Sequence, residues 1–257
     1  MASTINPKQL KRFHEDGFLL IRQLFPTDEI KRVLKFAKSD KVLKNEAYSK
    51  SDGEGGQSKL SVNNELGSTP YSAIVQSERV AGTMAQLLDD EVYHYHHKMM
   101  LKEPRVGGAW EWHQDYGYWY NNGCLFPDMA SCLIALDQAT QKNGCLQVIR
   151  GSHRMGRIDH GKAGTQTAAD LERVEAALQR MELIYCELEP GDALFFHGNL
   201  LHRSDQNRSE MPRWSLICCY NTRHNDPYVS HGRHPNYHPL TILPDDQVRD
   251  LLLAMSD

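Results

Sequence analysis

The 257-residue sequence lacks several features that would place it in familiar classes of protein. Its six cysteines are scattered without a C-x-x-C pair, which argues against a zinc ribbon and against a disulfide framework. No apolar run approaches the roughly 20 residues that span a bilayer, and the first residues contain no apolar signal core. The formal net charge of −4 gives no general basic field for nucleic acid. We therefore expect a cytoplasmic protein with reduced thiols, which binds neither membrane nor nucleic acid.

There is also no internal repeat, low-complexity tract or long linker, so we expect a single domain over residues 1–257. Short apolar runs broken by turn residues fill about 91–223, a pattern typical of a sandwich or barrel of short strands. Helical patterns are expected at 7–16, from 27 with Thr27 or Asp28 as cap, from Ser77, at about 168–181 and from Asp245. The chain is thus predicted as N-terminal helices (about 1–90), a β core and a C-terminal tail with a helix (224–257).

Residues 45–75 are polar and contain Gly53, Gly55, Gly56 and Gly67, so we expect a loop. A loop of this length in a compact domain is often a lid over a functional site, and otherwise a surface loop. The sequence leaves both alternatives open.

A His-x-Asp pattern occurs three times, at 14–16, 113–115 and 224–226. His113 and Asp115 end a strand-like run in the middle of the β region, where side chains at i and i+2 share a face. The first pattern lies at a helix–turn junction, and the last precedes a proline in a histidine-rich tail. Context therefore favours His113 and Asp115 as metal ligands.

A later strand-like run, "ALFFHGNLLH", leads into His202, and Arg213 starts the next apolar strand. Two histidines and one carboxylate that leave other positions open suit Fe(II) oxygen chemistry. A guanidinium that points into a barrel is costly unless it meets an anion, which a dicarboxylate co-substrate would supply. The alternative is that Arg213 is a surface arginine.

Four segments in this order resemble the phytanoyl-CoA dioxygenase family of Fe(II)/2-oxoglutarate oxygenases, and the resemblance runs almost end to end. They are "LKRFHEDGFLLIRQLFPTDEI", "WHQD", "KNGCLQVIRGSH" and "LEPGDALFFHGNLLHRSDQNRS" followed by Arg213. The resemblance implies a mainly β fold with flanking helices around a double-stranded β-helix (jelly-roll, cupin-like) core. It also implies a hydroxylase that uses Fe(II), 2-oxoglutarate and O2 and releases succinate and CO2.

Carried over to this sequence, the resemblance implies that His113, Asp115 and His202 are the iron ligands. It implies that Arg213 binds the distal carboxylate of 2-oxoglutarate, with Ser204 assisting. Lys102 lies near a lysine of the family, and its "LKEP" setting departs from the family's Asn-Lys-Pro. Because Asp115 is present, halogenation, which needs a vacant carboxylate position, is disfavoured.

Candidate substrate and pocket residues come from the surrounding composition. Aromatic residues cluster over 110–120, and Tyr116 and Trp119 are expected either to pack in the core or to line a substrate pocket. Arg150 opens a basic run that is either a solvated face or the mouth for an anionic substrate. In "HYHHKMM", alternation places His94, His96 and Lys98 on one face, and we expect Lys98 near the co-substrate and Met100 near the substrate.

Three functions were weighed on these residues. A zinc enzyme could use the same three ligands, but a hydrolase has no use for Arg213 at this spacing. A non-catalytic binding protein on the same scaffold would be expected to have lost a ligand, and none is missing. The sequence favours a dioxygenase that acts on a small polar or zwitterionic molecule.

Overall fold

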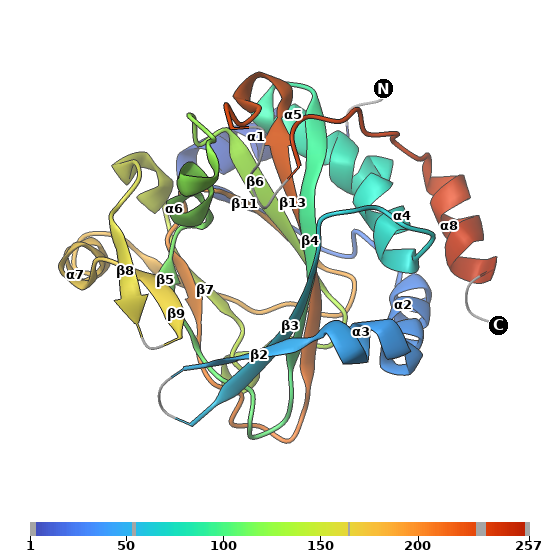
Figure 1. Ribbon diagram of the computed structural model, residues 1–257, viewed down its shortest axis with the longest axis horizontal. Coiled ribbons are helices and arrows are strands. Elements are labelled where there is room, and N and C mark those ends of the chain that lie inside the picture. Colours follow the sequence, from blue (N-terminus) through green and yellow to red (C-terminus); the bar gives the residue numbers. More distant parts are fainter. Residues whose placement is uncertain (1–3, 53–54, 164, 230–234, 255–257) are drawn as a thin grey trace.

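Two antiparallel sheets form the centre of the computed structural model, which describes residues 4–52, 55–163, 165–229 and 235–254 (Figure 1). The larger sheet has the order β1 (Phe18–Ile21), β11 (Ala193–His197), β6 (Met129–Ala135), β13 (Arg213–Thr222), β4 (Val92–Lys102), β3 (Gln57–Asn63) and β2 (Tyr48–Ser51). The smaller sheet has the order β10 (Leu183–Cys186), β7 (Leu146–Ile149), β12 (His202–Ser204) and β5 (Trp110–His113). The expected mainly β, jelly-roll core is confirmed.

The inner faces of the two sheets pack on each other. Leu133 and Leu194 of the larger sheet share one apolar cluster with Leu146 and Val148 of the smaller sheet. A separate hairpin, β8 (His160–Ala163) and β9 (Gln166–Ala169), lies beside β5 (Figure 1). The inner faces of the two sheets and this hairpin therefore surround the same interior region.

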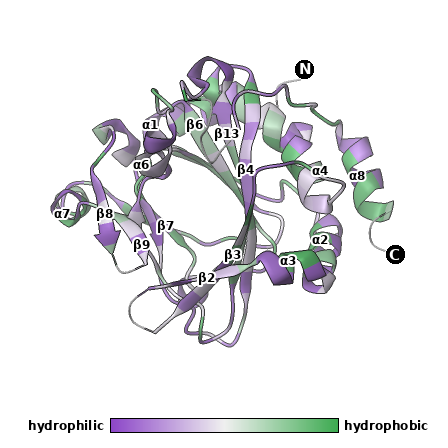
Figure 2. Ribbon diagram, viewed as in Figure 1, coloured by the Kyte–Doolittle hydropathy of each residue, from purple (hydrophilic) through white to green (hydrophobic). Residues whose placement is uncertain are grey.

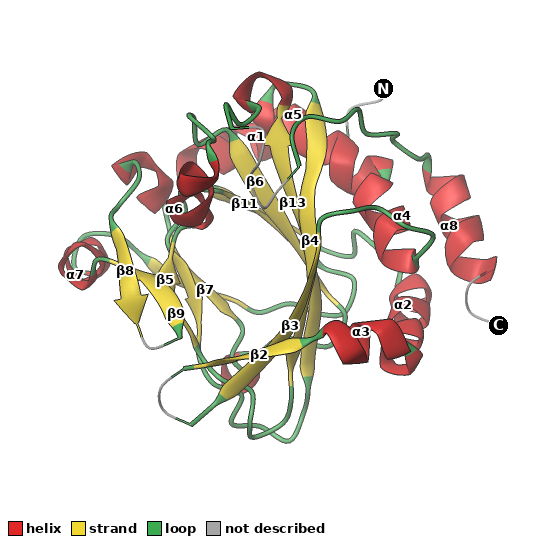
Figure 3. Ribbon diagram, viewed as in Figure 1, coloured by secondary structure: helices red, strands yellow, loops and turns green. Residues whose placement is uncertain are grey.

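Helices cover the outer face of the larger sheet (Figure 3). They are α1 (Pro7–Asp16), α2 (Thr27–Ser39), α3 (Lys41–Glu46), α4 (Pro70–Gln76), α5 (Thr83–Leu88) and α8 (Asp245–Ala254). Their apolar residues, such as Ile30 and Val33 of α2, share one buried cluster with outward residues of the sheet such as Leu216 and Cys218. The outermost helix, α8, packs on α2 and α4. Both hydrophobic and hydrophilic residues occur along α3 and α8 (Figure 2), as expected for helices with one packed face.

The prediction of a loop over 45–75 is wrong. The segment forms the hairpin β2–β3, and α4 begins at Pro70. β3 pairs with β4 over Lys59–Asn63 and so extends the larger sheet at its edge. Pairing to a preformed edge satisfies the backbone of a polar segment, so the tertiary context overrides its composition. Residues 53 and 54 lie outside the described part.

The predicted helix starts and caps agree only in part with the structure. Ser77 does cap a helical turn, because its side chain accepts a hydrogen bond from the Val80 amide. Neither Thr27 nor Asp28 caps α2, which has Pro26 at the capping position and no side-chain cap. The helix expected at 168–181 is shorter, at Leu171–Leu178 (α7), because the residues before it belong to β9. In the described part of the chain, no helix is long and apolar enough to cross a membrane.

Candidate active site

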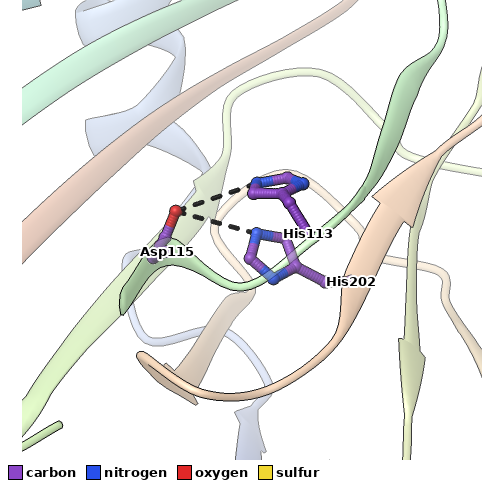
Figure 4. A group of neighbouring side chains, drawn as sticks. All are labelled: His113, Asp115 and His202. Carbon is purple, nitrogen blue, oxygen red and sulfur yellow. Dashed lines mark ion pairs between the residues drawn. The ribbon is translucent and has the colours of Figure 1, made fainter. Parts of the chain in front are cut away.

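His113, Asp115 and His202 meet at the inner face (Figure 4). Their potential ligand atoms all lie within 4.8 Å of one another. Oδ1 of Asp115 lies 3.8 Å from Nε2 of His113 and 3.9 Å from Nε2 of His202. Among the described residues, this is the one such group of histidine, cysteine and acidic side chains.

The backbone that carries these ligands differs from the expected continuous strand. β5 ends at His113, and Asp115 is the first residue of α6 (Asp115–Trp119). The intervening Gln114 keeps an extended conformation (φ −111°, ψ 134°), so His113 and Asp115 still point to one side. His202 is the Cα partner of His113 in the β12–β5 ladder, which brings residues 89 positions apart into contact.

Hydrogen bonds fix which atoms face the site. Nδ1 of His113 lies 2.7 Å from the carbonyl of Glu111, and Nδ1 of His202 lies 2.9 Å from the carbonyl of Leu200. A carbonyl only accepts, so both Nδ1 atoms donate, and both Nε2 lone pairs face the site. Ser131 donates to Oδ2 of Asp115 at 2.8 Å, which leaves Oδ1 free to bind.

The electrostatics of the three groups suit a cation. Burial holds the pKa of His113 well below its usual value, and burial also lowers the pKa of His202. Burial alone would raise the pKa of Asp115, but Lys98, at 3.8 Å, and the two histidines together lower it. At neutral pH the site thus offers two neutral nitrogen donors and one carboxylate, a donor set that fits Fe(II).

The other two His-x-Asp patterns serve other purposes. Asp16 accepts a hydrogen bond from Arg150 at 2.9 Å. His224 lies between Asp90 and Asp128, with Nδ1 2.5 Å from the first carboxylate and Nε2 2.8 Å from the second. The choice of the 113–115 pattern from sequence context therefore agrees with the geometry.

A narrow inner cavity continues from His113 and His202 toward Arg213. Its lining includes Leu60, Lys98, Met100, Leu133, Leu146, Ser204 and Arg213. Arg213 is only 3% exposed, and no ion pair within the described residues involves it. Burial lowers the pKa of its guanidinium to about 10, so the charge is retained at a cost. Arg213 is not the surface arginine of the alternative interpretation.

Lys102 and Ser204 lie beside Arg213, as expected for a site that binds a carboxylate. Nζ of Lys102 donates to Oγ of Ser204 at 2.9 Å and to the carbonyl of Asp205. Lys102 is the Cα partner of Arg213 in the β4–β13 ladder. Arg213 therefore lines one end of the inner cavity, and Lys102 lies next to it on the adjoining strand, bonded to Ser204 of the cavity wall. A buried guanidinium in this position suits a carboxylate ligand.

A second, wider cavity of about 440 Å³ opens beside His113 and Asp115. Its lining includes Tyr48, Lys50, Val62, Asn64, His96, Lys98, Trp110, Tyr118, Trp119, Gln166 and Thr167. Trp119 lies in this wall, as predicted for a substrate contact, and Lys98 lines both cavities. Met100 lies in the inner cavity, on the co-substrate side.

Tyr116 and Arg150 line neither cavity, contrary to their prediction as substrate contacts. Tyr116 lies in the first turn of α6, where its buried hydroxyl donates to the carbonyl of Cys124 at 3.0 Å. Arg150 forms ion pairs with Asp16 and Glu182, each at 2.9 Å, so the interpretation as a solvated face holds there.

Lys50 and Asn64 were not predicted as site residues, because their segment was interpreted as a loop, whereas Tyr48 of the same segment was a candidate contact if that segment covers the iron. The signal available was alternation, since Tyr48 and Lys50 share one face of β2, and Leu60 and Val62 share one face of β3.

His94 does not share a face with His96 and Lys98, as simple alternation predicted. The register between β4 and β13 shifts between Cys219 and Tyr220, and this irregularity moves His94 to the other side. Nε2 of His94 lies 3.0 Å from Nδ1 of His97, within the sheet's outer layer.

A jelly-roll core, two histidines with one aspartate, and a buried arginine at the end of the adjoining cavity are the features of non-haem iron oxygenases that use a keto-acid co-substrate. The chain matches the family model for phytanoyl-CoA dioxygenase (PhyH) over residues 13–215 and belongs to this family. It is an iron- and 2-oxoglutarate-dependent dioxygenase that acts on a small molecule.

Two curated relatives are informative. The chain is 31% identical to L-proline trans-4-hydroxylase of Streptomyces griseoviridis over 188 residues, which cover 67% of this chain and 68% of the relative. It is 24% identical to an ectoine dioxygenase of Bordetella bronchiseptica over 240 residues, which cover 87% of this chain and 78% of the relative.

Solved structures share the fold. The crystal structure of EctD from S. alaskensis with 2-oxoglutarate and 5-hydroxyectoine superposes with a TM-score of 0.79 at 22% identity, covering 95% of this chain and 89% of that one. The epimerase SnoN in complex with Fe3+, alpha ketoglutarate and nogalamycin RO superposes with a TM-score of 0.73 at 18% identity, covering 93% and 95%.

Proposed function

We propose that this dioxygenase hydroxylates a small zwitterionic metabolite that carries a carboxylate, and that residues 1–257 act as one oxygenase domain. The observation that supports it best is the composition of the 440 Å³ cavity beside His113 and Asp115. Apart from Asp115, that lining contains no acidic side chain, and it contains Lys50, Lys98 and several aromatic rings.

The iron would be held by Nε2 of His113, Nε2 of His202 and Oδ1 of Asp115. Iron bound there supplies the coupling of 2-oxoglutarate decarboxylation to oxidation of a substrate C–H bond. The protein's part is to hold these donors in their binding protonation state and to exclude water from them. The hydrogen bonds from Ser131 and to the carbonyls of Glu111 and Leu200 serve the first task.

The co-substrate would lie in the inner cavity, with its distal carboxylate on Arg213. Lys102 would add positive charge through its position opposite Arg213, and Ser204 would contribute a hydroxyl. Lys98 lines both cavities and faces Asp115. It would therefore contact the end of 2-oxoglutarate that binds the metal.

The substrate would lie in the wider cavity. Nζ of Lys50 donates to a neutral partner, the carbonyl of Thr165, at 3.3 Å, and so offers a cation to a substrate carboxylate. Trp119 and Tyr118 also line this cavity and would offer aromatic rings to a substrate ammonium or similar group. The relatives named for L-proline and for ectoine support a substrate of this size and polarity.

Anaerobic titration tests the reaction class. Adding 2-oxoglutarate to the Fe(II)-loaded protein is expected to produce a weak visible metal-to-ligand charge-transfer band. His113→Ala should lose that band while keeping its fold, because the barrel is held by its apolar faces. A band that persists in His113→Ala would contradict the ligand assignment. Succinate release in the presence of single zwitterions, each paired with its carboxamide, then tests the substrate class.

A further inference from the structure

The hairpin β8–β9 belongs to neither large sheet, and the reaction assigned above gives it no role. It packs mainly on β5, the strand that ends in His113. Two of its side chains, His160 and Gln166, reach the segment that carries His113 and Asp115. A third side chain, that of Gln114, fixes the same segment from the other direction.

Gln114 stands between the two ligands and is fully buried. Its Nε2 donates to the carbonyls of Gly156 and Asn199, each at 2.8 Å. Its Oε1 accepts from the Ile158 amide at 2.7 Å. The Asn199 bond ties the His113–Asp115 segment to the turn that leads into His202, so one side chain links the two parts of the metal centre.

His160 holds the backbone of Gln114. Its Nδ1 donates to the carbonyl of Ile158 at 2.8 Å, so its Nε2 must accept from the amide of Gln114 at 2.9 Å. The ring lies so close to α6 that a Cβ added at Gly117 would come within 2.2 Å of it. The glycine therefore leaves the space that the histidine ring needs.

Gln166 holds the strand on the other side of His113. Its Oε1 accepts from the Glu111 amide at 3.0 Å, and its Nε2 donates to the carbonyls of Ala109 and Ser51 at 3.0 and 3.2 Å. The carbonyl of Glu111 in turn fixes Nδ1 of His113. Gln166 also lines the substrate cavity, so the same side chain faces substrate and supports a ligand.

We propose that Gln114, His160 and Gln166 are positioning residues that preset the metal-binding geometry of His113 and Asp115, with β8–β9 as their supporting element. This proposal rests on the proposed function, because it requires that His113 and Asp115 bind the metal. Side chains that orient metal ligands raise the affinity for the metal, because the ligands lose less conformational entropy when the metal binds. Loss of such a side chain typically weakens metal binding 10- to 100-fold.

Titration of the full chain with Co(II), with no co-substrate or substrate, tests this directly. Gln114→Met and His160→Leu keep side-chain volume and remove the hydrogen bonds. We expect each to weaken Co(II) binding 10- to 100-fold and to change the Co(II) absorption spectrum. His160→Gln, whose amide oxygen can replace Nε2 as acceptor, should restore most of the affinity.

His94→Leu is the matched control, since it removes another buried histidine that makes one side-chain hydrogen bond, on the outer layer of the sheet. It should lower the free energy of unfolding and leave Co(II) affinity within twofold. Equal Co(II) affinity in Gln114→Met, His160→Leu and wild type would overturn the proposal. A wild-type chain that binds Co(II) no better than His113→Ala would instead overturn the ligand assignment itself.

If a variant does not fold, the wild-type chain supplies the deciding measurement. Zn(II) should slow amide hydrogen exchange at Gln114 and Ile158, whose amides belong to this network, and leave exchange at outer-layer residues of β4 unchanged. Unchanged exchange at both amides in Zn(II)-loaded protein would overturn the proposal.

Discussion

Arg213 and Lys102 are Cα partners in the antiparallel β13–β4 ladder, and both side chains are buried. Adjacent buried cations repel each other: burial is the main cause that lowers the pKa of Lys102 well below its usual value, and Arg213 adds to it. Such an arrangement costs folding free energy unless an anion enters. We therefore propose that an anion bound on Arg213 offsets this cost.

Arg213→Ala should weaken 2-oxoglutarate binding, because the distal carboxylate would be left desolvated and unpaired. The expected loss is on the order of 2–5 kcal/mol, by analogy with truncated buried charge pairs. Calorimetric titration of the Fe(II)-loaded protein measures it. Arg150→Ala, which removes an arginine outside both cavities, is the control. Equal affinity in Arg213→Ala and wild type would refute the role assigned to Arg213.

The unfolding free energy should fall as the pH falls below about 6.5. Burial lowers the pKa of His94 and His197 to about 3 and that of His97 to about 4. Between those values and 6.5 the unfolded chain binds more protons than the folded chain, so stability is present above 6.5 and lost in acid. In this pH range, each such histidine lowers the free energy of unfolding by about 1.4 kcal/mol for each unit by which the pH falls.

Urea unfolding of the metal-free protein at pH 7.5 and 5.5 checks the sign. His224 has the opposite dependence, because its hydrogen bonds to Asp90 and Asp128 raise its pKa. The stability that His224 contributes is present at low pH and lost as pH rises through its folded pKa. His224→Gln should therefore steepen the net acid dependence, and His94→Gln should reduce it. Stability that is higher at pH 5.5 than at 7.5 would contradict the prediction.

Prediction from sequence succeeded where a local pattern sets the direction of a side chain. It failed where the structure depends on contacts with residues far away in the chain. His113 and Asp115 were found because they follow a strand-like run, and β5 does end at His113. The run expected to lead into His202 is not one strand, because β11 ends at His197 and His202 begins β12 in the other sheet. The hairpin β2–β3 was missed because its polar residues pair with β4, and no local pattern encodes that partner. For Tyr116 the sequence left core packing and pocket lining open, and the structure places it in the apolar core, because Asp115 starts a helix that turns Tyr116 away from the cavities.

Lys50→Met should raise the KM for the substrate at least tenfold and leave 2-oxoglutarate affinity unchanged, since Lys50 lines only the wider of the two cavities near the metal site. Steady-state succinate release with the zwitterion identified by screening measures this. Lys59→Met removes an exposed lysine of the neighbouring strand β3 and is the control. An unchanged KM in Lys50→Met would place the substrate carboxylate elsewhere.

Trp119→Leu should also raise the substrate KM, through loss of a ring face of the cavity wall rather than of a charge. A cation–π contact contributes roughly 0.5–2 kcal/mol, so a few-fold to about 30-fold effect is expected. The effect should be smaller for a substrate analogue that lacks the positive group. If substrate and analogue lose affinity equally, Trp119 contributes packing alone.

The hairpin β2–β3 should act as a cover that opens for substrate. Ser51 and Thr165 exchange two hydrogen bonds: the Ser51 amide donates to Oγ1 of Thr165 at 3.1 Å, and that hydroxyl donates to the Ser51 carbonyl at 2.9 Å. With Lys50 bound to the Thr165 carbonyl, these contacts join β2 to the β8–β9 hairpin beside the substrate cavity. These three contacts are exposed, and the bond from Gln166 to the Ser51 carbonyl is partly buried; a segment held by mostly exposed contacts opens locally at low cost.

The rate of limited trypsin cleavage after Lys50 and Lys59 measures this opening. Thr165→Val removes both side-chain hydrogen bonds, so it should accelerate cleavage there and leave cleavage after Lys11 of α1 unchanged. Fe(II), 2-oxoglutarate and the identified substrate, added together without O2, should slow cleavage after Lys50, because a carboxylate on Lys50 adds a contact that only the closed hairpin makes. Equal cleavage rates with and without these ligands would show that the hairpin is a fixed wall of the cavity.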